Sequence, residues 1–487
     1  MRRKVLDIID EWYGSDRGSA LMIRGARQCG KTYAVEKYCE MKGIHSIRVD
    51  LARDEGSRRA FDGNLDVDEI VLNLSAEHPG FDFIPGRTLI FLDEIQECPR
   101  ARTALKSFAE DPGRSYRVIA SGSLLGLHMN DVPLPPTGYV EETTMGPMDF
   151  EEFLWALGVP EGVMAAVRAS ISSCEAIDPA IFESLSRYHR WYMAVGGMPE
   201  AVREFIASRQ IGPVRRVHEK ILRGYREDIR KHTADPRLAS RVEACFDSIP
   251  RMLGVENKRF RFKDVAGSDA RESGERSYNE GYSEYEGALD WLSMANMVLV
   301  CHRVSEMHMP LQERIKESMF KLYMLDTGLL IHLYEPELVG EVVNGNLEVN
   351  YGAITESAVA EALFLQGRRL YFYRDPSKRM EVDFVAVVDG SVCAVEVKSG
   401  SNRTCSSLNK AVCDMGLGGI MFETRNCFVD DKGVRHYPLF AASFFDSIDH
   451  REEPTFDFDG VDRLRELYGR STGRPCCSKA HRISGTV

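Results

Sequence analysis

The sequence predicts an α/β protein, with a doubly wound parallel sheet in its first third, a helical region after it and a second α/β domain. Short apolar runs alternate with helical patterns from Ser19 to about Val140, and parallel strands joined by helices form a sheet covered on both faces. A new alternation of strands and helices begins near Met319. A chain of 487 residues is also too long for one hydrophobic core, so we expect several domains.

The formal net charge of -12 and the pI near 5.6 indicate a soluble protein that repels nucleic acid on average. Contact with DNA or RNA would therefore need a local basic patch or a bound metal ion. Asp7, Asp10 and Glu11 interrupt the apolar residues near the N-terminus, and no apolar run approaches the roughly 18 residues of a membrane span. We expect a cytoplasmic protein with no membrane partner.

The twelve cysteines are scattered along the chain, without a CxxC pair or a histidine at zinc-ligand spacing. Cysteines of this kind are usually buried or incidental thiols. They indicate a reducing compartment and argue against a zinc site.

The first sheet should contain four strands, each of which reads as a short apolar run followed by a helical pattern. The predicted strands are Leu21–Ile23, Ser46–Val49, Thr88–Leu92 and Tyr116–Ala120.

The segment Gly25–Thr32 reads GARQCGKT and fits the GxxxxGK[ST] pattern of a phosphate-binding loop. Its glycines let backbone N–H groups turn toward an anion at a helix N-terminus, while the lysine and the hydroxyl complete the site. An apolar strand precedes it and a helical pattern follows at Tyr33–Met41, as the motif requires. We expect ATP to contact Gly25, Gln28, Cys29, Gly30, Lys31, Thr32 and Tyr33.

A second element, Leu89–Glu94, is an apolar strand that ends in two carboxylates. In this arrangement Asp93, together with Thr32, holds Mg²⁺, and Glu94 faces the attacking water. We therefore predict Lys31 and Glu94 as catalytic residues of a site that uses ATP and Mg²⁺.

A later strand ends in Ser121 and Ser123. If this strand lies beside the Asp93 strand, one of these hydroxyls could orient the γ-phosphate or the water. An equally good explanation is that the serines cap a helix that begins at Leu124.

The segment Met148–Leu154 begins a helical section that runs to about His232, and residues 196–199 (Gly-Gly-Met-Pro) mark a turn between two of its helices. Residues from about Ser240 to Val304 read as helix, basic segment, helix and strand, which could be a small winged-helix unit that contacts nucleic acid. A solvated hairpin is the alternative, because acidic residues dilute the basic charge. The basic residues of this segment are Lys258, Arg259, Arg261 and Lys263.

Five segments follow one another between residues 21 and 202: GARQCGKT, FLDEIQECP, ASGSLL, GPMDFEEFLWALG and GGMPEAV. With these segments the chain resembles the prokaryotic AAA-type ATPases of a widespread uncharacterised family. The resemblance implies a P-loop ATPase core with Walker A and Walker B elements. The family usually has Gly-Arg before the helix start, where this chain has Gly138-Tyr139. If that arginine acts on the γ-phosphate, its role is either missing here or belongs to another residue such as Arg226.

A two-residue hairpin is predicted at Asp389-Gly390, between the strands Val382–Val388 and Val392–Val397. Its register pairs residue 388 with residue 391 and therefore places Asp383 opposite Glu396. Like charges directly opposite each other are destabilising. A divalent cation between these acids would offset the repulsion, and oxygen ligands suit Mg²⁺.

The same register places Lys398 opposite Glu381. One alternative is a hairpin with a solvated face and a weak Glu381–Lys398 surface ion pair. Asp383, Glu396 and Lys398 also match the D-(E/D)-x-K pattern of restriction-endonuclease-like folds, which the same ATPase family carries in a C-terminal domain of unknown function. This resemblance implies that these three residues are catalytic and that Glu356 joins Asp383 and Glu396 as a metal ligand. The fold could also be retained without cleavage.

We predict five regions: an AAA-type ATPase core at 1–160, a helical lid at 161–238, a winged-helix-like segment at 239–310, a restriction-endonuclease-like domain at 311–450 and a tail at 451–487. Within the fourth region we expect the helix Ile354–Leu365 and the strands Leu370–Tyr373 and Gly419–Phe422. The last residues, Arg470–Val487, read as disordered.

Two functions fit these observations. In the first, ATP hydrolysis drives a conformational change and the C-terminal domain acts on DNA or RNA. In the second, the protein is a nucleotide-switched module that binds a protein partner, and its C-terminal domain is inert. A metabolic kinase fits less well, because no acceptor site is recognisable. The sequence leaves a ring, a dimer and a monomer open.

Overall fold

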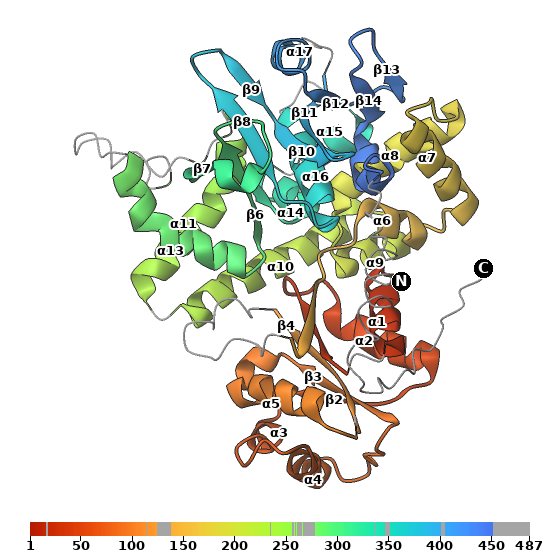
Figure 1. The fold of residues 1–487 in the computed structure, drawn as a ribbon, viewed down its shortest axis with the longest axis vertical. Coiled ribbons are helices and arrows are strands. Elements are labelled where there is room, and N and C mark those ends of the chain that lie inside the picture. The colour runs from red at the N-terminus through yellow and green to blue at the C-terminus, as the bar shows by residue number, and fades with distance from the viewer. Residues whose placement is uncertain are drawn as a thin grey trace, which may run out of the picture. The chain divides into compact units, whose positions relative to one another are not determined.

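The computed structural model describes residues 1–450, apart from residues 16–17, 114, 124–137, 234, 256–257, 259, 261–264, 266–277, 336, 346–350 and 401–404. Figure 1 shows the elements with their labels. Three predictions lie outside the described residues: the tail after residue 450, the helix that would begin at Leu124, and the basic residues Arg259, Arg261 and Lys263 of the expected winged-helix segment.

Five parallel strands form the first sheet, in the order β2-β3-β4-β1-β5. The four strands predicted from apolar runs are confirmed. The fifth strand, β5, has no apolar run to predict it, because it is a largely exposed edge strand with the sequence VEETT. The strands are β1 Ala20–Arg24, β2 His45–Asp50, β3 Thr88–Asp93, β4 Arg117–Gly122 and β5 Val140–Thr144.

Helices cover both faces of this sheet (Figure 1), which confirms the predicted doubly wound topology. On one face α1 and α2 bury Ile9 and Val35 against β1 and β3. On the other face α4 and α5 bury Ile70 and Leu105 against Met22 of β1. The elements are α1 Val5–Gly14, α2 Lys31–Lys42, α3 Glu55–Arg59, α4 Val67–Glu77, the 3-10 helix η1 Ile95–Glu97 and α5 Pro99–Glu110.

Strand β4 lies between β1 and β3, with Arg24 opposite Gly122 and Leu92 opposite Ala120. The predicted adjacency of the serine strand and the carboxylate strand is therefore confirmed. Because the three strands are parallel, the loop after β1, the two carboxylates at the end of β3 and the serines of β4 meet at one edge of the sheet.

A helical section follows, and a capping box fixes its first helix. The Asp149 carboxylate accepts a hydrogen bond from Glu152 N (2.8 Å), and the Glu152 carboxylate accepts one from Asp149 N (3.1 Å). Gly196, with a φ of 73°, ends α8 and Pro199 begins α9, so the predicted turn is confirmed. The helices are α6 Phe150–Ala156, α7 Glu161–Ser173, α8 Pro179–Val195, α9 Pro199–Ser208, α10 Ile211–His232, α11 Pro236–Leu253 and α13 Tyr278–Met294.

The second sheet has four strands in the order β7-β6-β8-β9. Strands β6 and β7 form an antiparallel hairpin, and β6 also pairs in parallel with β8. The domain boundary predicted at residues 310–311 falls inside this hairpin, because the partners of β6 lie later in the chain and leave no local signal. The strands are β6 Val298–Val304, β7 Ile315–Met324, β8 Tyr371–Asp375 and β9 Met380–Val382, and the 3-10 helix η3 Leu311–Arg314 connects β6 to β7.

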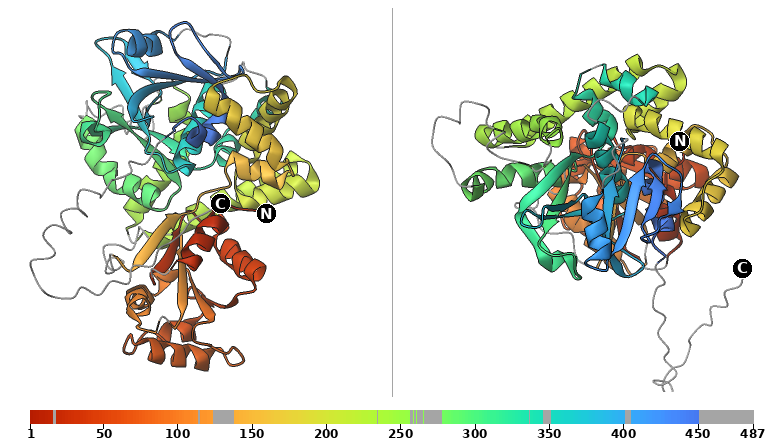
Figure 2. Two further views of the ribbon diagram at one scale, coloured as in Figure 1. Left: turned by 45° about the vertical axis from the view of Figure 1, so that its right-hand side comes forward. Right: turned by 90° about the horizontal axis from the view of Figure 1, so that it is seen from above.

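The third sheet has five strands in the order β10-β11-β12-β14-β13, and its strands are the light-blue to dark-blue arrows in Figure 2, whereas β8 and β9 of the second sheet are cyan. The stretch predicted as one strand, Val382–Val388, is divided, because β9 ends in the second sheet and β10 begins in the third. The chain changes sheet at Asp383. The remaining elements are α14 Thr327–His332, α15 Leu338–Asn344, α16 Tyr351–Leu365, β10 Phe384–Val388, β11 Ser391–Val397, α17 Ser406–Cys413, β12 Gly418–Glu423, β13 Phe428–Val429, β14 Arg435–Pro438 and the 3-10 helix η4 Leu439–Ser447.

The cysteines in the described part of the chain carry free thiols, and all of these except Cys413 are buried. This agrees with the prediction of unpaired, buried thiols. None of the helices in the described ranges is long and apolar enough to cross a membrane.

Candidate functional site

The loop after β1 is shaped by two glycines with positive φ, Gly25 (142°) and Gly30 (94°). A side chain at residue 25 is excluded, because a Cβ there would lie 1.9 Å from the carbonyl oxygen of Met145. The loop leads directly into α2, whose first residues are Lys31 and Thr32. The N-terminus of this twelve-residue helix therefore opens onto the loop, which is the arrangement that binds phosphate.

Lys31 places its ammonium group inside this loop. Its Nζ donates to the carbonyl oxygens of Gly25 (2.9 Å) and Ala26 (2.8 Å), and only 6% of the residue is exposed. A positive charge beside the first N–H groups of a helix creates a site for an anion.

Asp93, at the end of β3, lies directly beside Thr32. Asp93 Oδ2 accepts a hydrogen bond from Thr32 Oγ1 (2.9 Å) and lies 2.8 Å from Arg48 Nη2. Its Oδ1 accepts a hydrogen bond from Ser121. Hydroxyl and carboxylate oxygens suit Mg²⁺, and an ion that also contacts phosphate needs only one or two protein ligands. Thr32 and Asp93 therefore fit a Mg²⁺ ion at this edge.

Glu94, the next residue, is held by two neutral donors. Its Oε2 accepts hydrogen bonds from Gln96 Nε2 (2.6 Å) and Ser123 Oγ (3.0 Å). Burial would raise the pKa of Glu94, but the hydrogen bond from Gln96 and the charge of Lys31 outweigh burial and lower the pKa. Glu94 is therefore ionised at neutral pH and can accept a hydrogen bond from water.

Both predicted serines contact the carboxylates of this edge. Ser121 donates to Asp93 and Ser123 donates to Glu94. The alternative, in which they cap a helix from Leu124 onward, concerns residues outside the described part of the chain.

The side chains of three other predicted contact residues turn toward protein groups. The Gln28 amide lies close to α10, since a Cβ on Gly224 would be 3.5 Å from Gln28 Nε2. The Cys29 thiol donates to the Ala26 carbonyl (3.0 Å), and Tyr33 is half-exposed. Contact of these three residues with ATP stays a prediction.

The hairpin of the third sheet has the predicted register, with Phe384 opposite Val395, and its two turn residues have φ values of 51° and 74°. Asp383 lies just before β10, and its Oδ2 accepts a hydrogen bond from Val397 N (3.0 Å).

The predicted pairing of Glu381 with Lys398 is wrong. Glu381 belongs to β9 of the second sheet, where it lies opposite Arg374 and forms an ion pair with it (3.3 Å). Lys398 Nζ instead lies 2.7 Å from Glu396 Oε1. The change of sheet at Asp383 removes Glu381 from the hairpin.

Glu356 of α16 is bound by cations of the protein itself. Its Oε1 accepts hydrogen bonds from Lys321 Nζ (3.0 Å) and Tyr323 OH (2.5 Å), and its Oε2 pairs with Lys258. Burial would raise the pKa of Glu356, but the charges of Lys258 and Lys321 outweigh it and lower the pKa to about 2. Both carboxylate oxygens contact groups of the protein itself, and a role of Glu356 as a metal ligand stays a prediction.

Across the described ranges, no group of three or more His, Cys, Asp or Glu side chains is arranged to hold a metal ion. The metal site predicted from Glu356, Asp383 and Glu396 therefore stays a prediction. Lys321 lies near two of these acids, 3.0 Å from Glu356 and 3.9 Å from Asp383. The ammonium group of Lys321 neutralises part of the negative charge of Glu356 and Asp383, as a bound metal ion would.

Glu396 is the one acid of this cluster with a buried oxygen left over. Its Oε2 has no hydrogen-bond partner among the residues that the structure describes. Burial and the nearby charge of Asp383 raise the pKa of Glu396 to about 8. Burial also raises the pKa of Asp383. The pair is therefore poised to bind a proton or another cation.

A comparison with protein-family models matches residues 17–154 to a family described as AAA domain. The match covers all of the first sheet, with Lys31 on its loop and Asp93 and Glu94 at the end of β3. The chain contains an AAA-type P-loop ATPase domain. Residues 186–338 and 351–416, which follow the AAA domain, match two domains of unknown function, DUF8612 and DUF4143.

Two solved structures are similar to part of this chain. A Walker-type ATPase of Pyrococcus abyssi is 15% identical, and the match covers 68% of this chain and 95% of that chain with a TM-score of 0.39. PCH-2 of C. elegans is 13% identical, and the match covers 41% and 57% with a TM-score of 0.24. A comparison with curated proteins gives no match.

Tyr139 lies at the opposite edge of the AAA domain's sheet from the phosphate loop. It precedes β5, and its carbonyl oxygen accepts a hydrogen bond from Ala20 N at the start of β1 (3.0 Å). A strand of five residues spans about 16 Å. An arginine at this position would not reach phosphates bound to its own domain. The suggested substitute, Arg226, is paired with Asp247 (2.8 Å).

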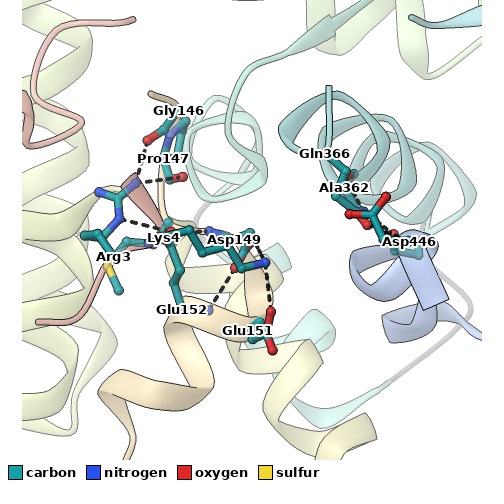
Figure 3. Close-up of polar contacts among 12 residues, drawn as sticks. Arg3, Lys4, Gly146, Pro147, Asp149, Glu151, Glu152, Ala362, Gln366 and Asp446 are labelled. Carbon is teal, nitrogen blue, oxygen red and sulfur yellow. Dashed lines mark hydrogen bonds and ion pairs between the residues drawn. The ribbon is translucent and has the colours of Figure 1, made fainter. Parts of the chain in front are cut away.

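Arg3 ties the phosphate loop of the AAA domain to α6, and Figure 3 shows its bonds to Gly146 and Glu152. It donates to the carbonyl oxygens of Cys29 and Gly146 (both 2.8 Å) and to the carboxylate of Glu152 (3.0 Å). The next residue, Lys4, donates through its backbone N–H to Glu152 (2.6 Å). Arg3 is only 5% exposed, so these bonds are shielded from water.

Three residues of the AAA domain's site have no counterpart in the sequence-based prediction. Gln96 lies in the FLDEIQECP segment, but the motif does not indicate that its side chain contacts Glu94. Arg48 lies between the buried residues Ile47 and Val49 of β2, so strand alternation alone predicts a solvent-facing side chain and no role in the site. For Arg3 there was no local signal, because its partners lie 26 and 149 residues away.

Proposed function

We propose that this protein binds ATP with Mg²⁺ at residues 25–32 and hydrolyses it, and that hydrolysis drives a conformational change in the helices that follow. The observation that carries this proposal is the meeting of a loop lysine, a hydroxyl and two carboxylates at one edge of the AAA domain's sheet. These residues are Lys31, Thr32, Asp93 and Glu94.

Each group has a role that its surroundings support. Lys31 and the N-terminus of α2 bind the β- and γ-phosphates, and Thr32 and Asp93 hold Mg²⁺, which neutralises phosphate charge. Glu94 accepts a hydrogen bond from the attacking water. As the water oxygen forms its bond to the γ-phosphorus, the bond from that phosphorus to the β–γ bridging oxygen breaks and a water proton passes to Glu94. ADP and phosphate then leave.

The contacts around the loop support a conformational response. Arg3 joins the loop to α6, and Met148 N, just before α6, donates to the Gly197 carbonyl in the turn before α9 (2.6 Å). A shift of the loop on binding phosphate therefore reaches two helices through short, direct bonds.

The proposal is tested by ATP binding and steady-state hydrolysis with three variants. Lys31→Ala should abolish binding, and Glu94→Gln should bind ATP but hydrolyse it at least about 100-fold more slowly. Lys37→Ala is the control, because Lys37 lies on the same helix and its side chain pairs with Glu40 at the surface (2.9 Å). Wild-type turnover by Lys31→Ala would contradict the proposal.

A second candidate function is cleavage of nucleic acid by the third sheet, as the restriction-endonuclease-like resemblance implies. The unpartnered Glu396 oxygen beside Lys398, across the hairpin from Asp383, favours it. Single- and double-stranded DNA and RNA should be incubated with the protein and Mg²⁺ or Mn²⁺. Cleavage that Asp383→Ala abolishes would support this role.

An absence of both binding and cleavage would instead favour the nucleotide-switched module with an inert C-terminal domain. In that case Glu94→Gln, which holds ATP without hydrolysing it, should retain a protein partner in an ATP-dependent manner.

A further inference from the structure

Asp228 of α10 is a buried carboxylate that contacts the phosphate loop. Its side chain is 3% exposed, and its Oδ1 pairs with Arg27 Nη1. Its Oδ2 is also buried but has no hydrogen-bond partner among the described residues. A buried carboxylate usually has both oxygens hydrogen-bonded, whereas here Asp228 Oδ2 is left without a donor among the described residues.

The charges of Arg27 and Glu94 both act on Asp228. Burial raises the pKa of Asp228 to about 6, against the opposing effect of Arg27, and the charge of Glu94 raises it further. Arg27 in turn contributes to the lowered pKa of Glu94. Arg27 belongs to the loop that precedes α2, so the Arg27–Asp228 pair lies at the edge where the proposed function puts the phosphates.

A buried carboxylate with one arginine partner is a poor source of stability, because the cost of desolvation offsets the attraction. A role in function would explain the pair better. Arg27 belongs to the loop itself and its side chain is 37% exposed, so it can turn from Asp228 toward a bound phosphate. Two other arginines, Arg24 and Arg48, lie on β1 and β2 and not on the loop, and they pair with Glu142 and Asp93 (both 2.8 Å).

We propose that Arg27 binds the γ-phosphate of ATP and stabilises its charge during hydrolysis, and that Asp228 holds Arg27 when no phosphate is bound. This inference rests on the proposed function. A γ-phosphate carries more negative charge than a carboxylate and offers three acceptor oxygens, so it competes effectively for the guanidinium group. Arg27 is then a catalytic residue, and Asp228 is a positioning residue.

The exchange has a consequence for α10. Among the described residues, the Arg27–Asp228 ion pair joins α10 to the loop through charge. Gln28 of the loop lies beside Gly224, which is one helical turn before Asp228. When ATP takes Arg27, α10 loses its ionic attachment to the AAA domain. Binding of a triphosphate, but not of a diphosphate, would therefore loosen the helix.

Equilibrium binding of ATPγS and ADP, each with Mg²⁺, tests the first half of the proposal. The wild type should bind ATPγS more tightly than ADP. In Arg27→Gln the ratio of the two affinities should fall by about tenfold or more, and the hydrolysis rate should fall by about 100-fold or more. Asp228→Asn should bind ATPγS roughly three- to tenfold more tightly with ADP affinity unchanged, because the competitor for Arg27 is gone. Arg230→Gln is the control and should leave both affinities unchanged, because Arg230 lies on the same helix and pairs with Glu243 (2.7 Å).

A double-mutant cycle tests the second half. Arg27→Gln, Asp228→Asn and the double variant should show coupled shifts in melting temperature without nucleotide, and independent shifts with saturating ATPγS. Coupling that persists with ATPγS, or an unchanged ATPγS preference in Arg27→Gln, overturns the inference while the proposed function stands. A wild type that binds neither nucleotide overturns both.

Discussion

Glu361 of α16 gives a prediction about stability and pH. It is 1% exposed, its Oε1 accepts a hydrogen bond from Tyr192 OH (2.8 Å), and its Oε2 accepts from the backbone and hydroxyl of Thr327 (both 2.9 Å). Burial and the nearby charge of Asp326 raise the pKa of Glu361 to about 8. In the native protein this carboxyl group therefore keeps its proton at neutral pH.

The sign of the effect follows from proton binding. Between pH 4.5, the ordinary value, and about 8, the unfolded chain loses the proton of Glu361 and the native protein keeps it, so the free energy of unfolding falls as the pH rises. At about 1.4 kcal/mol per pH unit the upper limit is about 5 kcal/mol. Asp326 has a raised pKa of about 6 and shares the same buried charge, so we expect roughly half of that limit.

Glu361→Gln should remove this pH dependence, because glutamine reproduces the protonated carboxyl group. Its oxygen can accept from Thr327, and its NH₂ group can donate to the Tyr192 oxygen while the Tyr192 hydroxyl donates to the Met148 carbonyl (2.9 Å). Between pH 5.5 and pH 8, which is 2.5 pH units, half of the limit is about 1.7 kcal/mol, so wild type should lose about 3–4 °C more in melting temperature than Glu361→Gln, at about 2 °C per kcal/mol.

Glu337→Gln, at an exposed position, is the control and should follow the wild type. The reasoning is refuted if Glu361→Gln shows the same loss between the two pH values as the wild type. A larger loss in the variant would also refute it, because the sign would then be reversed.

Two further predictions concern buried cations. Arg3→Met removes the hydrogen bond to the Cys29 carbonyl and should raise the Kd for ATP about tenfold, as measured by calorimetry, while Arg3→Lys should raise it less. An unchanged Kd in Arg3→Met would show that the loop does not need Arg3. Lys321→Met leaves Glu356 with Lys258 as its remaining cationic partner and should destabilise the protein by about 3–5 kcal/mol in thermal unfolding. The double variant with Glu356→Gln should recover most of that stability. Equal destabilisation of the single and double variants would contradict the role of Lys321 as a neutralising charge.

Features of the AAA domain that depend on neighbouring residues could be predicted from the sequence. The strand β1, the glycines of the loop and Lys31 form one continuous stretch, and β3 carries Asp93 and Glu94 at its own end. The Asp389-Gly390 turn also fixed the hairpin register, because a two-residue turn allows only one pairing. Each of these predictions needs information from fewer than about 15 residues, which is what local patterns hold.

Features that depend on distant residues could not be predicted. Lys321 lies 35 residues before Glu356, and Arg27 lies 201 residues before Asp228, so no spacing rule connects them. The division of the 382–388 stretch at Asp383 has the same cause, because strand partners in two different sheets decide where β9 ends. Alternation along the stretch is compatible with one strand or two.

The change of sheet at Asp383 has a consequence for dividing this protein into parts. Strand β9 pairs with β8, β8 pairs with β6, and β10 continues from Asp383 into the third sheet. A shortened chain that starts at residue 311 would lack β6 and leave β7 and β8 without the strand between them. The smallest piece in which Asp383 and Glu396 keep their positions therefore begins before Val298, and assays on the isolated C-terminal region should use that starting point.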